Sequence, residues 1–370
     1  MSTDTTDGQN APRPGPVAPQ EGASLLAGTA RDLPTGRHQF HRERLMVQIQ
    51  QEQRAPQDSG RPAPAKRRGL RLPRPAITLP LTAVAVATAV VLALSSGGEQ
   101  PGTGLATGPA LTTTVGVATT RGVPQLLDQI SLAAAKTSHP TVGEGQFVYV
   151  ESQTADTFVK TVDDRPSLAS HVLHRRQVWM SPDGKEGWLI DPAVNDGKKG
   201  ETLSLPDEKG NPREAYLNGP SYAYLAALTT DPDQILAKIY KETKGMGNSP
   251  DQQAFTTIGD LLGESYPPAE LSSALFKAAA KIPGVAVVEN AVDAVGREGV
   301  AVVRLDEASG QREEWIFDRA SHAFLGQRTV QVKKGTGDDA LLVPGTVTHT
   351  SAITKRAVVD GIKEVPSQAG

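Results

Sequence analysis

Two histidines three residues apart, His171 and His174, have the spacing that comes closest to a metal site in this sequence. On one face of a helix, two imidazoles at that spacing can bind the same ion, as they do in zinc sites. The segment 171–180 instead has the pattern of a strand, in which positions three apart point to opposite faces. We therefore predict that both are surface or half-buried histidines that bind no metal.

Other residue types that support catalysis lack the arrangement that catalysis needs. The sequence has no cysteine, which excludes disulfides, thiolate metal sites and cysteine nucleophiles. The hydrolase elbow, zinc-protease, P-loop, dinucleotide-binding, EF-hand and kinase motifs are all missing. Paired carboxylates are direct neighbours, which face apart on a strand: Asp163–Asp164, Glu313–Glu314 and Asp338–Asp339. We expect no catalytic residue, metal or cofactor, and we predict that the protein is not an enzyme.

The three tryptophans, Trp179, Trp188 and Trp315, lie in segments with a strand pattern. Such residues usually pack in a core, and the alternative is that they line an apolar ligand groove. Segments 171–180 and 186–191 flank residues 181–184 (SPDG), whose composition favours a turn. We predict a hairpin here, with Trp179 and Trp188 on its two arms.

Residues 77–94 (ITLPLTAVAVATAVVLAL) form an uncharged run of 18 residues, just long enough to cross a bilayer as a helix. Basic residues precede the run, and no Lys or Arg follows it until Arg121. The positive-inside rule then places the N-terminus in the cytoplasm and the C-terminal part outside the cell membrane. The residues that we expect to determine this topology are Lys66, Arg67, Arg68, Arg71 and Arg74.

Three other interpretations of this run remain open. A cleaved signal peptide has a short region before its apolar part, whereas 76 residues precede this run. A buried core helix would leave the basic cluster without a role, and a twin-arginine signal fits poorly with the residues that follow Arg67 and Arg68.

Net charge is +5 in residues 1–76 and −8 in the rest of the chain. Opposite charges on the two sides of one apolar run indicate membrane topology first, and we expect no nucleic-acid partner.

The segment before the basic cluster has the character of a docking arm. Residues 38–53 can form a helix with one apolar-to-mixed face, but a helix of 16 residues is only marginally stable alone in water. We therefore expect the arm to bind a cytoplasmic partner. The alternatives are a helix lying on the membrane surface and simple disorder. The candidate partner-binding residues are His38, His41, Leu45, Met46 and Ile49.

Composition and periodicity divide the chain into six parts. We predict a disordered tail (1–30), a helical cytoplasmic arm (31–54), a basic Pro-rich linker (55–76), a transmembrane helix (77–95), a flexible linker (96–121) and an extracytoplasmic domain (122–365). Helical periodicity predicts helices near 124–138, 232–244, 250–262 and 268–281. Strand patterns cover 146–151, 285–289, 299–306, 312–317, 324–332 and 345–359.

These elements indicate an α+β fold in the outer domain. We expect a curved antiparallel sheet that carries helices on one side, because the strands follow one another in the last third of the domain. Residues 312–332 are predicted to form a hairpin that turns at 318–322. At the start of the helix near 232, Asp231 can cap the first turn and Pro232 can take the first helical position.

Residues 33–49 contain the pattern LPxGRHxxHxExLMxxI, and residues 296–302 (GREGVAV), 313–318 (EEWIFD) and 324–326 (FLG) follow it. Together these motifs resemble an uncharacterised actinobacterial family of single-pass membrane proteins, over residues 33–332. The resemblance implies a short cytoplasmic arm, one span and an outer α+β domain. More loosely, the late hairpin is similar to the concave half-barrel sheets of lipoprotein-carrier and sigma-regulator sensor domains, which is a likeness of fold alone.

Members of that family are often associated with extracytoplasmic-function sigma factors, which implies a role similar to anti-sigma or sensor proteins. The zinc-binding class of anti-sigma factors is excluded because this chain has no cysteine for its metal signature. We expect a membrane-anchored, non-enzymatic sensor or regulator that links an envelope ligand to a cytoplasmic partner, such as a sigma factor. The alternatives are a tethered module that binds envelope lipid or lipoprotein, and an unrecognised envelope enzyme.

Overall fold

The computed structural model describes residues 105–137, 141–162, 165–195, 197–203 and 214–366. The expected arm (31–54), basic linker (55–76) and transmembrane helix (77–95) lie outside these ranges. Over the described residues, no helix combines the length and the apolar character that crossing a bilayer requires.

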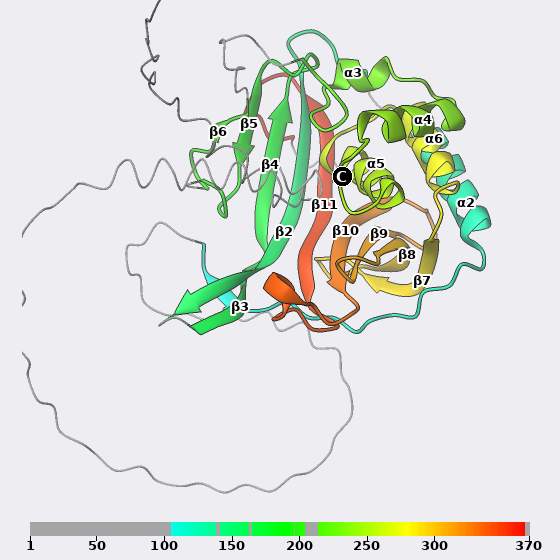
Figure 1. Ribbon diagram of the computed structural model, residues 1–370. Helices are drawn as coiled ribbons and strands as arrows, with labels where there is room; N and C mark the ends of the chain where they lie inside the picture. Colours follow the sequence, from blue (N-terminus) through cyan, green and yellow to red (C-terminus); the bar gives the residue numbers. More distant parts are fainter. Residues whose placement is uncertain (1–104, 138–140, 163–164, 196, 204–213, 367–370) are drawn as a thin grey trace, which may run out of the picture.

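The centre of the fold is one 11-stranded antiparallel sheet (Figure 1). Nine strands follow the order β6-β5-β4-β2-β11-β10-β9-β8-β7, while β3 continues the far end of β2 and β1 pairs with β3. The strands are β1 (Thr107–Pro109), β2 (Phe147–Val162), β3 (Arg165–His171), β4 (His174–Met180), β5 (Gly187–Ile190), β6 (Glu201–Thr202), β7 (Val285–Val292), β8 (Glu298–Asp306), β9 (Gln311–Phe317), β10 (Phe324–Gln331) and β11 (Val347–Val359).

Helices pack on one face of this sheet, which we call the helix-bearing face (Figure 1). Helices α2 and α5 contact β7, β8 and β10, and α6 lies between α2 and α4. Side-chain caps begin three of the described helices: Ser221 accepts a hydrogen bond from the amide of Tyr224, Asp231 accepts from those of Asp233 and Gln234, and Ser249 accepts from that of Gln252. The helices are α2 (Val123–Lys136), α3 (Tyr222–Ala226), α4 (Pro232–Glu242), α5 (Pro250–Glu264) and α6 (Ala269–Ala279), with a short 3-10 turn at Gly337–Asp339.

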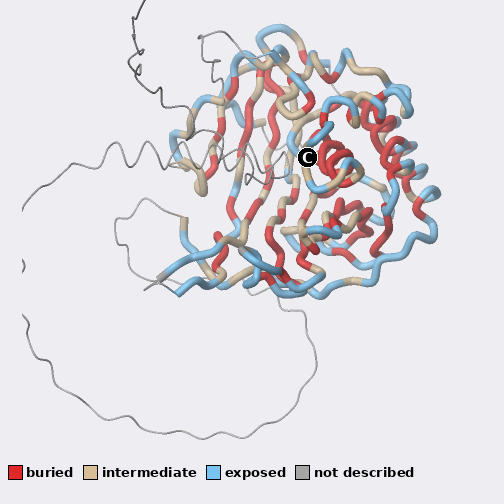
Figure 2. Tube along the Cα trace, in the orientation of Figure 1, coloured by how far each residue is buried: buried red, intermediate tan, exposed pale blue. Residues whose placement is uncertain are grey.

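The main hydrophobic core fills the space between these helices and the β7–β9 strands (Figure 2). Its central contact is the stack of Phe255 from α5 on Trp315 from β9, with ring centroids 3.8 Å apart and planes 6° apart. Trp315 is fully buried, which confirms core packing for this tryptophan. Burying aromatic rings of this size removes much apolar surface from water and fixes the helices against this part of the sheet.

The structure confirms a mixed fold with a large antiparallel sheet and a few helices. The predicted hairpins are also present: β9 and β10 pair across a turn that Asp318 stabilises, and Trp179 lies opposite Trp188 on β4 and β5. Four predicted helices agree with α2, α4, α5 and α6 to within a few residues at each end. These elements are local, because a cap, a turn or a periodic run within the segment specifies each one.

Residues 105–122, which we call the strap, correct the expected flexible linker over its described part (Figure 1). The strap crosses the lower end of the sheet from β3 to α2, and its backbone pairs with three separate strands. Val172 donates to Ala106 O at 3.1 Å, Val347 donates to Leu111 O at 2.9 Å, and Thr119 donates to Val287 O at 2.9 Å. Backbone carbonyl and amide groups that are satisfied in this way hold the strap in place, so the folded part begins before Gly122.

Two further differences concern strands. The strand expected over 146–151 is the start of β2, which has 16 residues and pairs with β4 and β11 before it continues to β3. The segment 171–180 is not one strand, because His171 ends β3 and His174 begins β4. The two rings consequently lie on the same side, with centroids 6.1 Å apart, and the predicted opposite orientation is wrong.

Candidate functional site

Paired residues on neighbouring strands point to the same side of a sheet, so the register shows what lines the helix-bearing face. One row runs from Val302 and Trp315, beneath the helices, to the polar residues of the other strands: Gln327, Ser351, Thr154 and His174. The next row is polar throughout: Arg304, Glu313, Thr329, His349 and Asp156. The face therefore changes from an apolar core to a polar surface as it leaves the helices.

His174, at the start of β4, is the centre of this polar surface. Its ring is buried, and its Nε2 lies 3.0 Å from Oδ1 of Asp191, the residue that follows β5. Its Nδ1 lies 2.9 Å from the carbonyl oxygen of Val172. A carbonyl oxygen and an ionised carboxylate can only accept hydrogen bonds, so both ring nitrogens must carry protons. The geometry therefore favours an imidazolium ion paired with a buried carboxylate.

The electrostatics of this pair agree with its geometry. Burial alone would lower the pKa of His174, but the hydrogen bonds to Asp191 and Val172 and the charges of Asp191 and Asp156 outweigh burial and raise that pKa. Burial alone would raise the pKa of Asp191, but the hydrogen bond from His174 and the charge of Arg176 lower it. Arg176 Nε lies 3.5 Å from the second carboxylate oxygen, which makes a three-membered charged group.

His174→Gln is expected to change how stability depends on pH. The folded-state pKa of His174 is raised, so its contribution is complete below an unfolded pKa of about 6.5 and is lost as pH rises through the folded pKa. The deficit of the variant should therefore be largest near pH 6 and shrink toward alkaline pH. Urea unfolding at a series of pH values measures this deficit.

The matched control for that series is His322→Asn, which changes a histidine in the turn between β9 and β10. This variant removes a histidine that is not part of the buried pair, and the two pH series are compared directly. A deficit for His174→Gln that does not change with pH would show that the buried ring is neutral in the folded protein.

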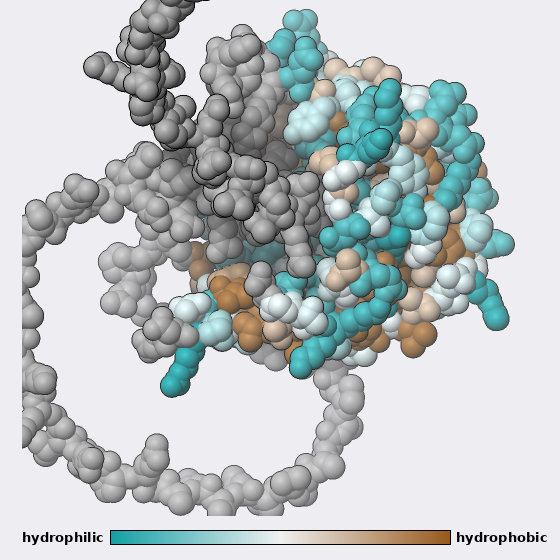
Figure 3. All heavy atoms as spheres, in the orientation of Figure 1, coloured by the Kyte–Doolittle hydropathy of each residue, from teal (hydrophilic) through white to brown (hydrophobic). Residues whose placement is uncertain are grey.

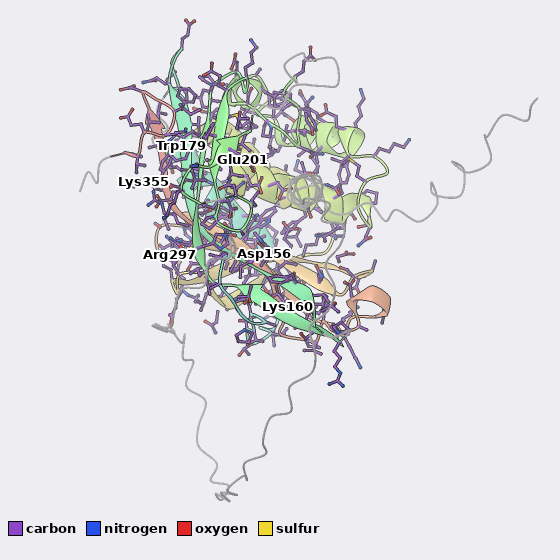
Figure 4. All side chains as sticks on the ribbon, turned by 90° about the vertical axis from the view of Figure 1, so that its left-hand side faces the viewer. Asp156, Lys160, Trp179, Glu201, Arg297 and Lys355 are labelled. Carbon is purple, nitrogen blue, oxygen red and sulfur yellow. The ribbon has the colours of Figure 1, made fainter. Side chains whose placement is uncertain are left out.

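A second histidine–aspartate pair lies on the same face. His349 Nδ1 of β11 is 2.8 Å from Oδ1 of Asp156, the residue opposite it on β2. Asp156 is labelled in Figure 4. His171 packs its ring against Phe158, with centroids 4.7 Å apart. Within the described ranges, no three His, Asp or Glu side chains are arranged to hold a metal ion. The polar surface consists of His174, Arg176, Asp191, Asp156 and His349, and its chemistry is that of fixed ion pairs and hydrogen bonds.

The opposite, helix-free face carries a buried charged cluster beneath the strap. Glu314 is fully buried between two arginines: Arg312 Nε donates to its Oε1 and Arg328 Nε to its Oε2, each at 2.7 Å. Arg312 also donates to Gly116 O at 2.8 Å, and Arg328 to the Thr113 hydroxyl at 3.3 Å. The two arginines thus connect the strap to β9 and β10.

Neighbouring Glu313 points to the helix-bearing face, as predicted for adjacent carboxylates on a strand. It accepts hydrogen bonds from Thr256 of α5 at 2.7 Å and from Trp315 Nε1 at 3.0 Å. Glu313 and Glu314 therefore serve two separate networks on the two sides of one strand, and neither acts with the other as an acid–base pair.

All the sequence-predicted site residues lie outside the described residues, in the arm (His38, His41, Leu45, Met46 and Ile49) and in the basic linker (Lys66, Arg67, Arg68, Arg71 and Arg74). Sequence reasoning missed Asp156, Asp191 and His349. The one sequence signal for Asp156 and His349 is the alternation of polar residues along β2 and β11, which shows that one side of each strand is not apolar. Asp191 follows β5 and lies outside that pattern. It does not show which strands lie side by side.

No protein-family model matches this chain, and no curated protein is detectably similar to it. Function is therefore inferred from the geometry of the described residues and from the topology expected from the sequence.

Proposed function

We propose that this protein is a membrane-anchored, non-enzymatic sensor or regulator, in which an outer ligand-binding domain is coupled to a cytoplasmic arm. The observation that carries the proposal is the strap, which is hydrogen-bonded to β3, β11 and β7. A tether for a passive module needs no such contacts, whereas these contacts give a physical route for a signal between the sheet and the N-terminal side of the chain.

The polar part of the helix-bearing face is the proposed ligand surface. Its ion pairs join β2, β4, β11 and the segment after β5, so a ligand that changes one pair shifts strands that the strap also contacts. The lining favours a polar ligand over a lipid tail, because burying these charged groups against hydrocarbon would be unfavourable. Figure 3 adds that the outer surface of the helices is mainly hydrophilic on the side in view.

A pull-down with residues 1–76 as bait is expected to enrich one cytoplasmic protein, with a sigma factor as the leading candidate. The control bait carries Leu45→Asp, Met46→Asp and Ile49→Asp, which place charge on the apolar face of the arm without changing its length. Enrichment on the native bait and loss on the control would support the regulator and locate its contact face.

The opposite result would count against the proposal. If neither bait enriches a specific protein, the arm is a simple tether, and the alternative of an envelope lipid- or lipoprotein-binding module becomes the better description. If both baits enrich the same protein, the apolar face of the arm is not the contact surface.

A further inference from the structure

An aromatic platform lies on the helix-free face, on the side of the sheet opposite to the proposed ligand surface. It consists of Tyr149, Trp179 and Trp188, which are cross-strand neighbours on β2, β4 and β5. The rings of Tyr149 and Trp179 have centroids 5.1 Å apart, and Phe147 and Val359 complete the cluster. Trp179 is almost fully buried, while Trp188 is half-buried.

The chain's own C-terminal segment, residues 361–366, occupies this platform. The Nζ atom of Lys363 lies 3.6 Å from the ring centroid of Trp188, well within the distance of a cation–π contact. Trp179 Nε1 donates to the carbonyl oxygen of Glu364 at 2.6 Å. Lys355 Nζ donates to the carbonyl oxygen of Pro366 at 3.3 Å, and Figure 4 places Trp179 and Lys355 in the same upper part of the sheet.

These contacts recognise an ammonium group and two backbone carbonyls, and they recognise little else. The larger apolar side chains of the segment are exposed: Ile362 is 37% and Val365 is 47% exposed. Lys363 also adopts a φ of 68°, a left-handed conformation that is unfavourable for a residue with a side chain. A segment with strained backbone and few buried groups is held weakly.

We infer that the aromatic platform is a binding site for lysine-containing peptide segments that can form a tight turn at the lysine, and that residues 361–366 occupy it in cis. The required pattern is a lysine followed by carbonyls one and three residues later, which Trp188, Trp179 and Lys355 contact in turn. Most of this recognition is through the backbone, so a partner needs the lysine and a chain that can adopt the turn between Gly361 and Glu364, but no matching sequence.

The cis segment sets the conditions under which a partner can bind. A tethered segment has an effective concentration of the order of millimolar, so a free peptide of modest affinity cannot displace it at lower concentrations. Loss or displacement of the tail therefore opens the site. This inference concerns the opposite face of the sheet and does not depend on the proposed function.

The test uses fluorescence anisotropy with a labelled, N-acetylated peptide of residues 361–370 (GIKEVPSQAG). Three forms of the protein are compared: the full chain, the chain ending at Asp360, and the full chain with Lys363→Gln. We expect binding to be at least about tenfold tighter for the chain ending at Asp360 than for the full chain, because the cis competitor is gone. Lys363→Gln should give an intermediate affinity and keeps the tail in place, so it tests the site even if the shortened chain folds poorly.

Two matched probes distinguish specific recognition of the lysine from non-specific peptide binding. A peptide with Gln in place of Lys363 should bind several-fold more weakly, consistent with loss of a cation–π contact of about 1 kcal/mol. Trp188→Leu in the chain ending at Asp360 should weaken binding by a similar factor, and Trp188→Phe should restore part of it.

An unrelated peptide that keeps only the lysine and the proline at their positions tests whether the platform binds segments other than residues 361–366. Binding of this peptide supports a site for partners. If only the peptide of residues 361–370 binds, or if the Gln peptide binds as well as the Lys peptide, the inference is wrong. The platform would then serve only to hold the chain's own C-terminal segment.

Discussion

Glu314→Gln is expected to destabilise the protein by about 3–5 kcal/mol, because it leaves the two guanidinium groups beneath the strap without their shared counter-ion. Arg312 and Arg328 are 6% and 7% exposed at their side chains and form their ion pairs with Glu314 alone, as far as the described residues show. An amide has the same shape but cannot neutralise either charge. Since typical domains are stable by about 5–15 kcal/mol, this loss is a large fraction of the total.

Urea unfolding, followed by tryptophan fluorescence on a chain that keeps the whole strap, measures the effect. The control is Glu307→Gln, which removes an exposed ion pair with Lys333 and should cost no more than about 1 kcal/mol. An equally small loss for Glu314→Gln would mean that the arginines are hydrated or paired elsewhere. It would contradict the view that the ion pairs with Glu314 hold Arg312 and Arg328 in place beneath the strap.

Trp315→Ala is expected to cost about 3–5 kcal/mol, the usual range for removing a large aromatic ring from a core. The ring is fully buried and stacks on Phe255, so its loss separates α5 from β9. The substitution also removes the Nε1 donor to Glu313, whose carboxylate would keep fewer partners. Both effects act in the same direction.

The comparison for this substitution is Trp188→Ala, assayed under the same conditions. Trp188 is only half-buried and packs beside the C-terminal segment, so its loss should cost clearly less. If Trp188→Ala were the more damaging of the two, the stability of the protein would depend on the tail and not on the contact between helices and sheet.

Elements that are specified by their own residues could be predicted from the sequence. The cap at Asp231, the turn at Asp318 and the turn at residues 181–184 depend on groups within four residues of one another. The class of fold follows from the same information, because strands that succeed one another with short turns pair in antiparallel fashion.

Features that depend on distant pairing could not be predicted. The strap's contacts with β7, β9 and β11 join residues more than 150 positions apart. Nothing in the Thr- and Gly-rich sequence 105–121 distinguishes it from a linker. The polar surface also depends on pairing between distant strands. His349 and Asp156 are 193 positions apart, and only the register of β2 against β11 brings them together. The candidate arm and span residues remain predictions, because they lie outside the described residues.

The pairing of the strap with β7 also bears on aggregation. β7 is the last strand of the sheet order, and its sequence begins with the apolar run VAVV. An uncovered edge of this kind can pair with the same edge of another molecule and nucleate self-association. Thr119 occupies part of that edge by exchanging both backbone hydrogen bonds with Val287. The strap thus also protects the β7 edge of the sheet from self-association. A chain that started at Gly122 would fold with this edge exposed to solvent and would be more prone to aggregate.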